Sequence, residues 1–207
     1  MKGRCLIVSG GALCTLPEEL RAADCVIACD RGWQYAEQVG LSPDLIVGDF
    51  DSAPTPKPGA RVERAPTRTD DTDTMLAARR ALALGYREIA ICCAFGGRLD
   101  HTLANLQTAA FLVSHGARTR LLGADTDALA FCGGCMRFPR RGGWSLSVFA
   151  LSDRCEGVTI RGAKYACENV TLTNAFPLGV SNVWASAEVE VSARSGILLV
   201  MQSKLYS

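Results

Sequence analysis

The feature that most constrains the fold is a change of hydrophobic periodicity near residue 130. Before it, short apolar runs of the kind that form buried strands alternate with segments of helical periodicity. The expected strands are residues 5–8, 26–29, 45–47, 89–94 and 120–122, and the expected helices are 32–39, 72–84 and 99–115. This alternation predicts a parallel sheet with helices on both faces, that is, a three-layer α/β domain.

After the change, the pattern has a period of two residues and no long helical segment. The period-two runs are residues 144–150, 157–160, 170–173, 188–191 and 197–201, separated by glycine-, proline- and asparagine-rich turns. Such a pattern is typical of an antiparallel all-β sandwich. We therefore predict two domains, residues 1–133 and 134–207.

One expected helix has a predicted orientation. In residues 99–115 the apolar side chains recur at helical spacing, and this stripe is expected to face the core. Its members are Leu99, Leu103, Leu106, Ala110 and Val113. Asn105 lies on another face, among polar neighbours.

Composition excludes several classes of protein. Lys plus Arg number 22 and Asp plus Glu number 21, so no overall basic charge favours nucleic acid as a partner. No run approaches the roughly 18 apolar residues of a membrane span. The ten cysteines lie mostly in or beside apolar runs without paired framework spacing, so we expect reduced thiols in a cytoplasmic protein. Cys132 and Cys135 have the spacing of a metal hook, but no second pair accompanies them, and zinc is not expected.

Acidic residues follow several of the predicted strands. Asp30, Asp49, Asp51 and Asp100 all stand at or just after such an end. Ligands of open α/β sheets bind beyond the carboxyl ends of the strands, where these side chains are expected to converge. Asp49 and Asp51 are two residues apart, which places both on one side of an extended backbone, and Mg²⁺ relieves the repulsion between such carboxylates. The alternative is that they are ordinary turn or capping residues.

A second acidic segment precedes the predicted helix 72–84. Asp70, Asp71 and Asp73 stand at its first turn, where free N–H groups favour anions. Helix capping readily explains one or two of these carboxylates, but it is a weaker explanation for all three. If Asp70 caps the helix, Asp73 lies one turn further on and faces the same crevice as Asp49 and Asp51.

The third segment joins a predicted strand to the helix 99–115. Gly96 and Gly97 let backbone amides approach a phosphate, and Arg98 adds a planar cation for phosphate oxygens. The alternative for Arg98 is a solvated surface charge, and His101 is interpreted as a residue of the helix start. Neither a P-loop nor a complete dinucleotide fingerprint is present in the sequence.

These segments, in this order, resemble the thiamine pyrophosphokinase family. The motifs are DRG at 30–32, PDLIVGDFDS at 43–52, DDTD at 70–73 and GGRLDHTLAN at 96–105, with looser matches at 161–165 and 179–182. The resemblance implies an α/β domain that binds Mg²⁺ and ATP, a β-sandwich domain that binds thiamine, and a homodimer. It also implies transfer of diphosphate from ATP to the hydroxyl of thiamine.

The resemblance further implies a role for each matching position. Asp49, Asp51, Asp73 and Asp100 are the expected metal-binding and catalytic carboxylates, and Gly96, Gly97 and Arg98 attend the phosphates. Asp30 and Asn105 line the nucleotide side, and Ser181, Asn182 and Trp184 are the candidate thiamine contacts. For Trp184, core packing is an equal alternative.

Two positions depart from the family pattern. Arg31 stands where the family usually has glycine, and Thr69 stands where it usually has lysine. These departures motivate one alternative, a catalytically silent sensor of nucleotide or thiamine. A second alternative does not depend on them: a diphosphokinase with the same acidic crevice that acts on another hydroxymethyl heterocycle such as a pterin and differs only in its acceptor pocket.

Overall fold

A computed structural model describes residues 3–50, 61–64 and 71–206 of the chain. The chain forms two compact units, which divide between residues 124 and 125. The predicted boundary between residues 133 and 134 falls inside a strand, β7 (Thr126–Pro139), which belongs to the second unit.

The first unit contains a parallel sheet. Its strands lie in the order β4-β3-β2-β1-β5-β6, and every neighbouring pair is parallel. Their bounds are β1 (Arg4–Val8), β2 (Cys25–Cys29), β3 (Leu45–Gly48), β4 (Val62–Arg64), β5 (Glu88–Cys92) and β6 (Arg118–Leu122). The central strands are buried along almost their whole length, which is the reason that they read as continuous apolar runs.

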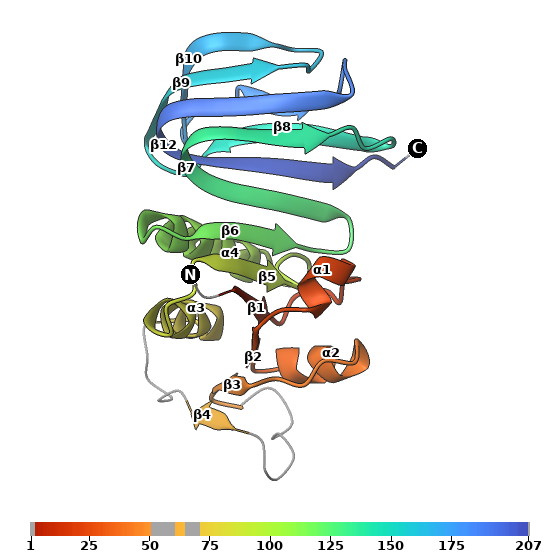
Figure 1. Ribbon diagram of the computed structural model, residues 1–207, viewed down its shortest axis with the longest axis vertical. Coiled ribbons are helices and arrows are strands. Elements are labelled where there is room, and N and C mark those ends of the chain that lie inside the picture. The colour runs from red at the N-terminus through yellow and green to blue at the C-terminus, as the bar shows by residue number, and fades with distance from the viewer. Residues whose placement is uncertain (1–2, 51–60, 65–70, 207) are drawn as a thin grey trace. The chain divides into compact units, whose positions relative to one another are not determined.

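Helices cover both faces of this sheet (Figure 1). They are α1 (Glu18–Arg21), α2 (Gly32–Gln38), α3 (Asp73–Ala83) and α4 (Leu99–Ser114). Leu6, Val26 and Ile46 of one face pack in a cluster that includes Leu20 of α1 and Trp33 of α2. On the other face α3 contacts β1, β2 and β3, and α4 contacts β6. The predicted three-layer α/β architecture is confirmed.

The predicted orientation of α4 is wrong at the start of the helix and right at its end. Leu99 is 82% exposed and Leu103 57% exposed, whereas the buried stripe includes Asn105, Thr108 and Leu112 together with the expected Val113. The physical reason is that the Asn105 side chain finds a hydrogen-bond partner inside: its Nδ2 donates to the Ala94 carbonyl at 2.8 Å. A satisfied amide is thus buried in place of an apolar side chain.

The second unit is entirely β. Besides β7 its strands are β8 (Trp144–Ala150), β9 (Arg154–Arg161), β10 (Cys167–Thr173), β11 (Gly179–Asn182) and β12 (Glu188–Lys204). Their pairings with one another are antiparallel. The first part of β12 pairs with β9 and its last part pairs with β8, while β7 runs beside most of its length (Figure 1).

A bend shared by β7 and β12 makes the sandwich. In β12 the inward side chains are Val189, Val191 and Ala193 before the bend and Leu198 and Val200 after it, so the phase of the alternation changes. The pairing register shifts between Ala193 and Ile197. Such an irregularity lets one strand contribute to two sheets that enclose a single core. The predicted antiparallel β domain is confirmed, although β12 was expected as two strands.

Seven of the ten cysteines are buried, in keeping with their apolar sequence context, and Cys132 and Cys135 are exposed. None of the helices in the described part of the chain is long and apolar enough to cross a membrane.

The bend gives a test of the fold. Gly196 has φ +88°, and a Cβ there would lie 2.3 Å from the Arg154 carbonyl oxygen, whereas Gly134 has φ +81° with nothing within 4 Å. Gly134→Ala should therefore cost only the left-handed backbone strain, about 1–2 kcal/mol. Gly196→Ala should lower the free energy of unfolding by more, because a backbone clash is added. Urea denaturation measures both, with Gly142→Ala as the unstrained control; equal losses for Gly196→Ala and Gly134→Ala would contradict the packing at the bend.

Candidate active site

The carboxyl ends of the parallel strands meet at one edge of the α/β unit. From β1 the chain proceeds outward through β2 and β3 to β4, and then returns to the other side of β1 as β5 and β6. The order therefore reverses between β1 and β5, and ligands of open α/β sheets bind at such a switch point. The segments that follow β1, β2, β3 and β5, residues 9–12, 30–32, 49–50 and 93–98, are called the C-terminal edge below.

Backbone contacts hold the turns after β1 and β5 together. The Gly11 N–H donates to the Cys93 carbonyl at 2.9 Å, and the Ala12 N–H donates to the Phe95 carbonyl at 2.8 Å. The two predicted phosphate-binding glycines differ in their surroundings. A Cβ on Gly96 would lie 2.7 Å from the Ala12 Cβ, whereas a Cβ on Gly97 would meet nothing within 4 Å. Gly96 thus serves the close packing of the two turns, and Gly97 leaves its backbone open to solvent or ligand.

Backbone strain is concentrated at the C-terminal edge. Among the described residues, the non-glycine positions with positive φ include Asp30 (41°), Phe50 (57°) and Cys93 (53°), which closely follow β2, β3 and β5. A fourth, Ser181 (59°), lies in the other predicted site segment. Left-handed backbone at non-glycine residues costs energy and is found preferentially at functional sites.

Asp30 and Asp49 lie on neighbouring strand ends. The Asp30 N–H donates to the Val47 carbonyl at 2.8 Å, and a Cβ on Gly48 would lie 3.2 Å from the Asp30 Cα. Both aspartates are half-buried. The expectation of an extended backbone from Asp49 to Asp51 is wrong, because β3 ends at Gly48 and Phe50 is left-handed. Asp51 itself lies outside the described residues.

Asp73 is the first residue of α3 and is also brought to this edge. Thr72 caps the helix, its Oγ1 accepting from the Met75 N–H at 3.2 Å, and the Asp73 carbonyl accepts from the Cys29 thiol at the end of β2 at 3.5 Å. Asp71 instead forms an ion pair with Arg79 at 2.8 Å. Asp70, the cap considered from the sequence, lies outside the described residues, as does Thr69.

Arg98 and Asp100 form an exposed ion pair at the start of α4. The Arg98 Nε donates to Asp100 Oδ1 at 3.1 Å, and a second bond joins Nη2 to Oδ2. The hydrogen bond from Arg98 holds the pKa of the Asp100 carboxyl below its usual range. A phosphate that binds Arg98 must therefore compete with Asp100, and in doing so it releases that carboxylate for another cation.

No cluster of three or more His, Cys, Asp or Glu side chains in the described ranges is close enough to hold a metal ion. The donors at the edge are nevertheless of the right kind. Asp49 and Asp73 offer hard carboxylate oxygens, and Mg²⁺ commonly takes only one or two protein carboxylates, completing its shell with waters and substrate phosphates. The residues present therefore fit Mg²⁺ bound together with a polyphosphate.

Asn105 lies beneath the C-terminal edge. Its side chain is 4% exposed, and Nδ2 donates to the Ala94 carbonyl at 2.8 Å and approaches Ser9 Oγ at 3.5 Å. It therefore anchors α4 to the segment after β5.

In the β unit, Asn182 holds a neighbouring segment in place. Its Oδ1 accepts from the Tyr165 N–H at 2.9 Å, and its Nδ2 donates to the Tyr165 carbonyl at 2.8 Å. Tyr165 itself is 62% exposed. Ser181 is exposed, and its N–H donates to Ser147 Oγ at 3.0 Å. Tyr165 is an aromatic candidate that sequence reasoning did not single out, although it lies in the matching segment 161–165.

Trp184 is part of the core of the β unit. It is 6% exposed, and its Nε1 donates to the Phe138 carbonyl at 2.8 Å. This placement favours the core-packing alternative for Trp184.

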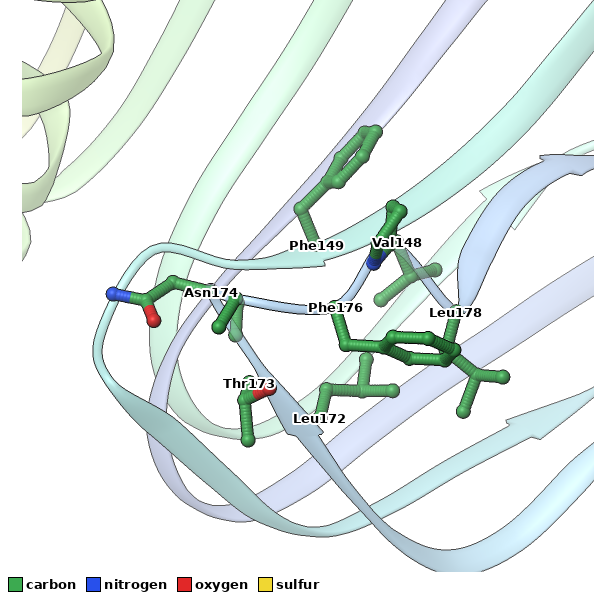
Figure 2. Close-up of a pocket in the computed structure, with 10 residues that line it drawn as sticks. Val148, Phe149, Leu172, Thr173, Asn174, Phe176 and Leu178 are labelled. Atoms are coloured by element: carbon green, nitrogen blue, oxygen red, sulfur yellow. The ribbon is translucent and has the colours of Figure 1, made fainter.

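The segment before β11 and the adjacent parts of β8 and β10 line an apolar pocket of about 320 Å³ (Figure 2). Its rim includes Phe176, 66% exposed, and Leu178, 58% exposed. The residues that line it are Val148, Phe149, Ala150, Leu172, Thr173, Asn174, Ala175, Phe176, Pro177 and Leu178.

An α/β unit with acidic strand ends, a glycine turn and an arginine at its switch point is typical of enzymes that act on phosphate esters. Comparison with known families identifies the particular family within this class of enzymes. Residues 16–121 match the family model described as the thiamin pyrophosphokinase catalytic domain, and residues 136–198 match the thiamin pyrophosphokinase vitamin B1 binding domain. The chain belongs to the thiamin pyrophosphokinase family.

Individual relatives agree with this assignment. The chain is 28% identical to the thiamine pyrophosphokinase of Bacillus subtilis over 208 residues, covering 95% of this chain and 97% of the relative. A crystal structure of thiamine pyrophosphokinase from Bacillus subtilis matches with a TM-score of 0.85 and 27% identity, covering 97% of this chain and 99% of the other. A thiamin pyrophosphokinase family protein from Enterococcus faecalis matches with a TM-score of 0.78 and 26% identity, covering 98% and 100% of the two chains.

Proposed function

We propose that this protein transfers a diphosphate group from ATP to the hydroxyl of thiamine, producing thiamine diphosphate and AMP. The observation that carries the proposal is the match of both units to the two domains of one kinase family. The arrangement of the C-terminal edge supports it, because Asp49 directly follows β3 and Asp73 lies against the end of β2, at the same edge of the sheet from which the segment 93–98 emerges after β5.

Asp49, Asp51, Asp73 and Asp100 are the proposed ligands of Mg²⁺. The chemistry that Mg²⁺ supplies when bound is neutralisation of the charge on the phosphate oxygens. Arg98 binds the same phosphates after exchanging its Asp100 partner for phosphate oxygens. The open backbone at Gly97 allows the polyphosphate to approach closely.

The proposed reaction is an in-line displacement at the β-phosphorus. A bond forms between the thiamine hydroxyl oxygen and the β-phosphorus, and the bond from the β-phosphorus to the bridging oxygen of the α-phosphate breaks, so that AMP leaves. The hydroxyl proton passes to a carboxylate, either Asp73 or Asp100. The protein contributes chiefly by positioning the reactants and compensating their charge.

Asp30 and Asn105 are the proposed residues of the nucleotide side. Asp30 is supported by its left-handed backbone at the end of β2. Asn105 is supported more indirectly, since it holds the segment after β5 from below.

On the thiamine side, Ser181 and Asn182 are the proposed residues of the β unit. Ser181 is exposed and available for direct contact, whereas the Asn182 amide is occupied by the backbone of Tyr165. We propose that Asn182 acts by presenting the largely exposed Tyr165 ring. The Lys164 ammonium lies 5.3 Å from the centroid of this ring, and a cationic heterocycle would take the place of that ammonium. Trp184 then contributes through packing.

We also propose that the protein is cytoplasmic and forms a homodimer. Exposed apolar side chains support an association of subunits, namely Leu99 and Leu103 on α4 and Phe176 and Leu178 before β11.

The carboxylate assignment is tested by a matched pair of neighbouring aspartates. Asp73→Asn should lower the rate of thiamine diphosphate formation by roughly a hundredfold or more, because the Mg²⁺ that neutralises the phosphate charge would lose an anionic ligand. Asp71→Asn should stay close to wild type, because that carboxylate is paired with Arg79. Both rates are measured by chromatography of AMP and thiamine diphosphate, with circular dichroism to verify folding. Full activity of folded Asp73→Asn would refute the assignment.

The role of Tyr165 is tested through the acceptor. Tyr165→Ala should raise KM for thiamine by roughly tenfold, the loss expected for a cation–π contact worth about 1–2 kcal/mol, and should leave KM for ATP unchanged. Tyr165→Phe retains the ring and should remain near wild type. Steady-state kinetics with each substrate varied measures the effect, and an unchanged KM for thiamine in Tyr165→Ala would exclude the contact.

A further inference from the structure

A buried polar network lies directly beneath the C-terminal edge. It consists of Ser9, Thr74 and Asn105, which are 4%, 6% and 4% exposed. Ser9 Oγ and Thr74 Oγ1 share a hydrogen bond of 2.9 Å, and Asn105 Nδ2 reaches Ser9 Oγ at 3.5 Å. Three residues that are 31 to 96 positions apart in the chain are thereby joined through side chains alone.

The network joins three segments that carry the proposed chemistry. Ser9 is the first residue after β1, at the switch point of the sheet. Thr74 immediately follows Asp73 in the first turn of α3. Asn105 belongs to α4, whose first turn contains Asp100, and its amide also binds the Ala94 carbonyl after β5.

The first turn of α3 is held at two adjacent residues. Thr74 is fixed to β1 through Ser9, and the Asp73 carbonyl is fixed to β2 through the Cys29 thiol at 3.5 Å. Two attachments to different strands oppose rotation of the turn about the helix axis. That rotation determines the direction in which the Asp73 side chain leaves the helix.

Stability alone does not require hydroxyl groups at these positions. Replacing both partners of a buried hydrogen bond by apolar groups of the same shape is often nearly neutral. What a directional bond adds is a single arrangement of the groups that it joins. A carboxylate that must hold the Mg²⁺ of a bound diphosphate to within a fraction of an ångström benefits from such a constraint.

We propose that Thr74 and Ser9 are positioning residues, which set the direction of Asp73 toward the metal-bound diphosphate. This inference rests on the proposed function, since it takes Asp73 as a ligand of the Mg²⁺ that accompanies ATP. Neither hydroxyl contacts substrate; both act through the first turn of α3.

The kinetic test compares two substitutions at one site. Thr74→Val keeps the shape and removes the hydroxyl, and it should lower kcat by roughly tenfold to a hundredfold, the loss expected for a displaced reacting group, with KM for thiamine unchanged. Thr74→Ser keeps the hydroxyl and should restore kcat to within a few-fold of wild type. Thr108→Val is the matched control, because Thr108 is buried and, within the part of the chain that the structure describes, its hydroxyl bonds the Ala104 carbonyl of its own helix.

A binding measurement separates positioning from a general loss of structure. Mn²⁺ binding is followed by electron paramagnetic resonance in the presence of α,β-methylene-ATP, whose bridging bond is not cleaved. The Thr74→Val and Ser9→Ala variants should bind Mn²⁺ about tenfold more weakly, as for loss of a ligand-orienting contact, and Thr108→Val should bind as wild type does. The double variant should be little worse than either single one, because both remove the same bond.

The outcomes distinguish this inference from the proposed function. If Thr74→Val matches Thr108→Val in kcat and in Mn²⁺ affinity while Asp73→Asn is inactive, the positioning role is refuted and the proposed function stands. If folded Asp73→Asn is fully active, the carboxylate assignment fails instead. Reduced thermal stability of Thr74→Val with unchanged kcat and Mn²⁺ affinity of its folded fraction would also refute the positioning role, and Ser9→Ala supplies the test should Thr74→Val not fold.

Discussion

Parallel pairing of β1 with β2 on one side and with β5 on the other is the constraint from which the candidate site follows. Because all strands of this sheet run in one direction, the segments after β1, β2, β3 and β5 emerge at one edge. Close backbone approach then requires glycine at particular points. At Gly32 a Cβ would lie 2.0 Å from the Val8 carbonyl oxygen, and at Gly11 it would lie 2.4 Å from that of Cys93. Residues distant in sequence are thus assembled by the sheet itself.

The buried hydrogen bonds below the C-terminal edge and the exposed ion pair at its surface differ in how firmly they hold their side chains. The bond between Ser9 and Thr74 is shielded from water, so it retains its directional preference and helps to define one orientation of α3. The Arg98–Asp100 pair is solvent-exposed, and exposed pairs contribute little to stability. An exposed pair is also easily exchanged, which suits residues that have to bind phosphate and release product. The structure thus combines buried side chains held in one arrangement with exposed charged side chains that can change partners.

Much of the fold was predictable from the sequence. Parallel strands buried on both faces are continuously apolar, whereas antiparallel strands with one exposed face alternate between apolar and polar residues. The motif segments were predictable as well, but the burial, backbone conformation and contacts of their individual residues were not. Asn105 was expected on a polar face and is buried, because no periodicity records that a carbonyl at Ala94 would satisfy it. Phe50 was expected in extended backbone, and its left-handed conformation depends on tertiary context. Tyr165 is a comparable case, since its exposed and fixed position follows from the distant Asn182 amide.

The central claim is that ATP is cleaved only as its diphosphate moves to thiamine. The most direct measurement is the amount of AMP and thiamine diphosphate formed by the purified protein from ATP and Mg²⁺, with thiamine present and with thiamine absent. The account predicts the two products in equal amounts when thiamine is present, and no AMP above background when it is absent. AMP release that does not depend on thiamine, or the absence of AMP from a folded protein that binds thiamine, would contradict it.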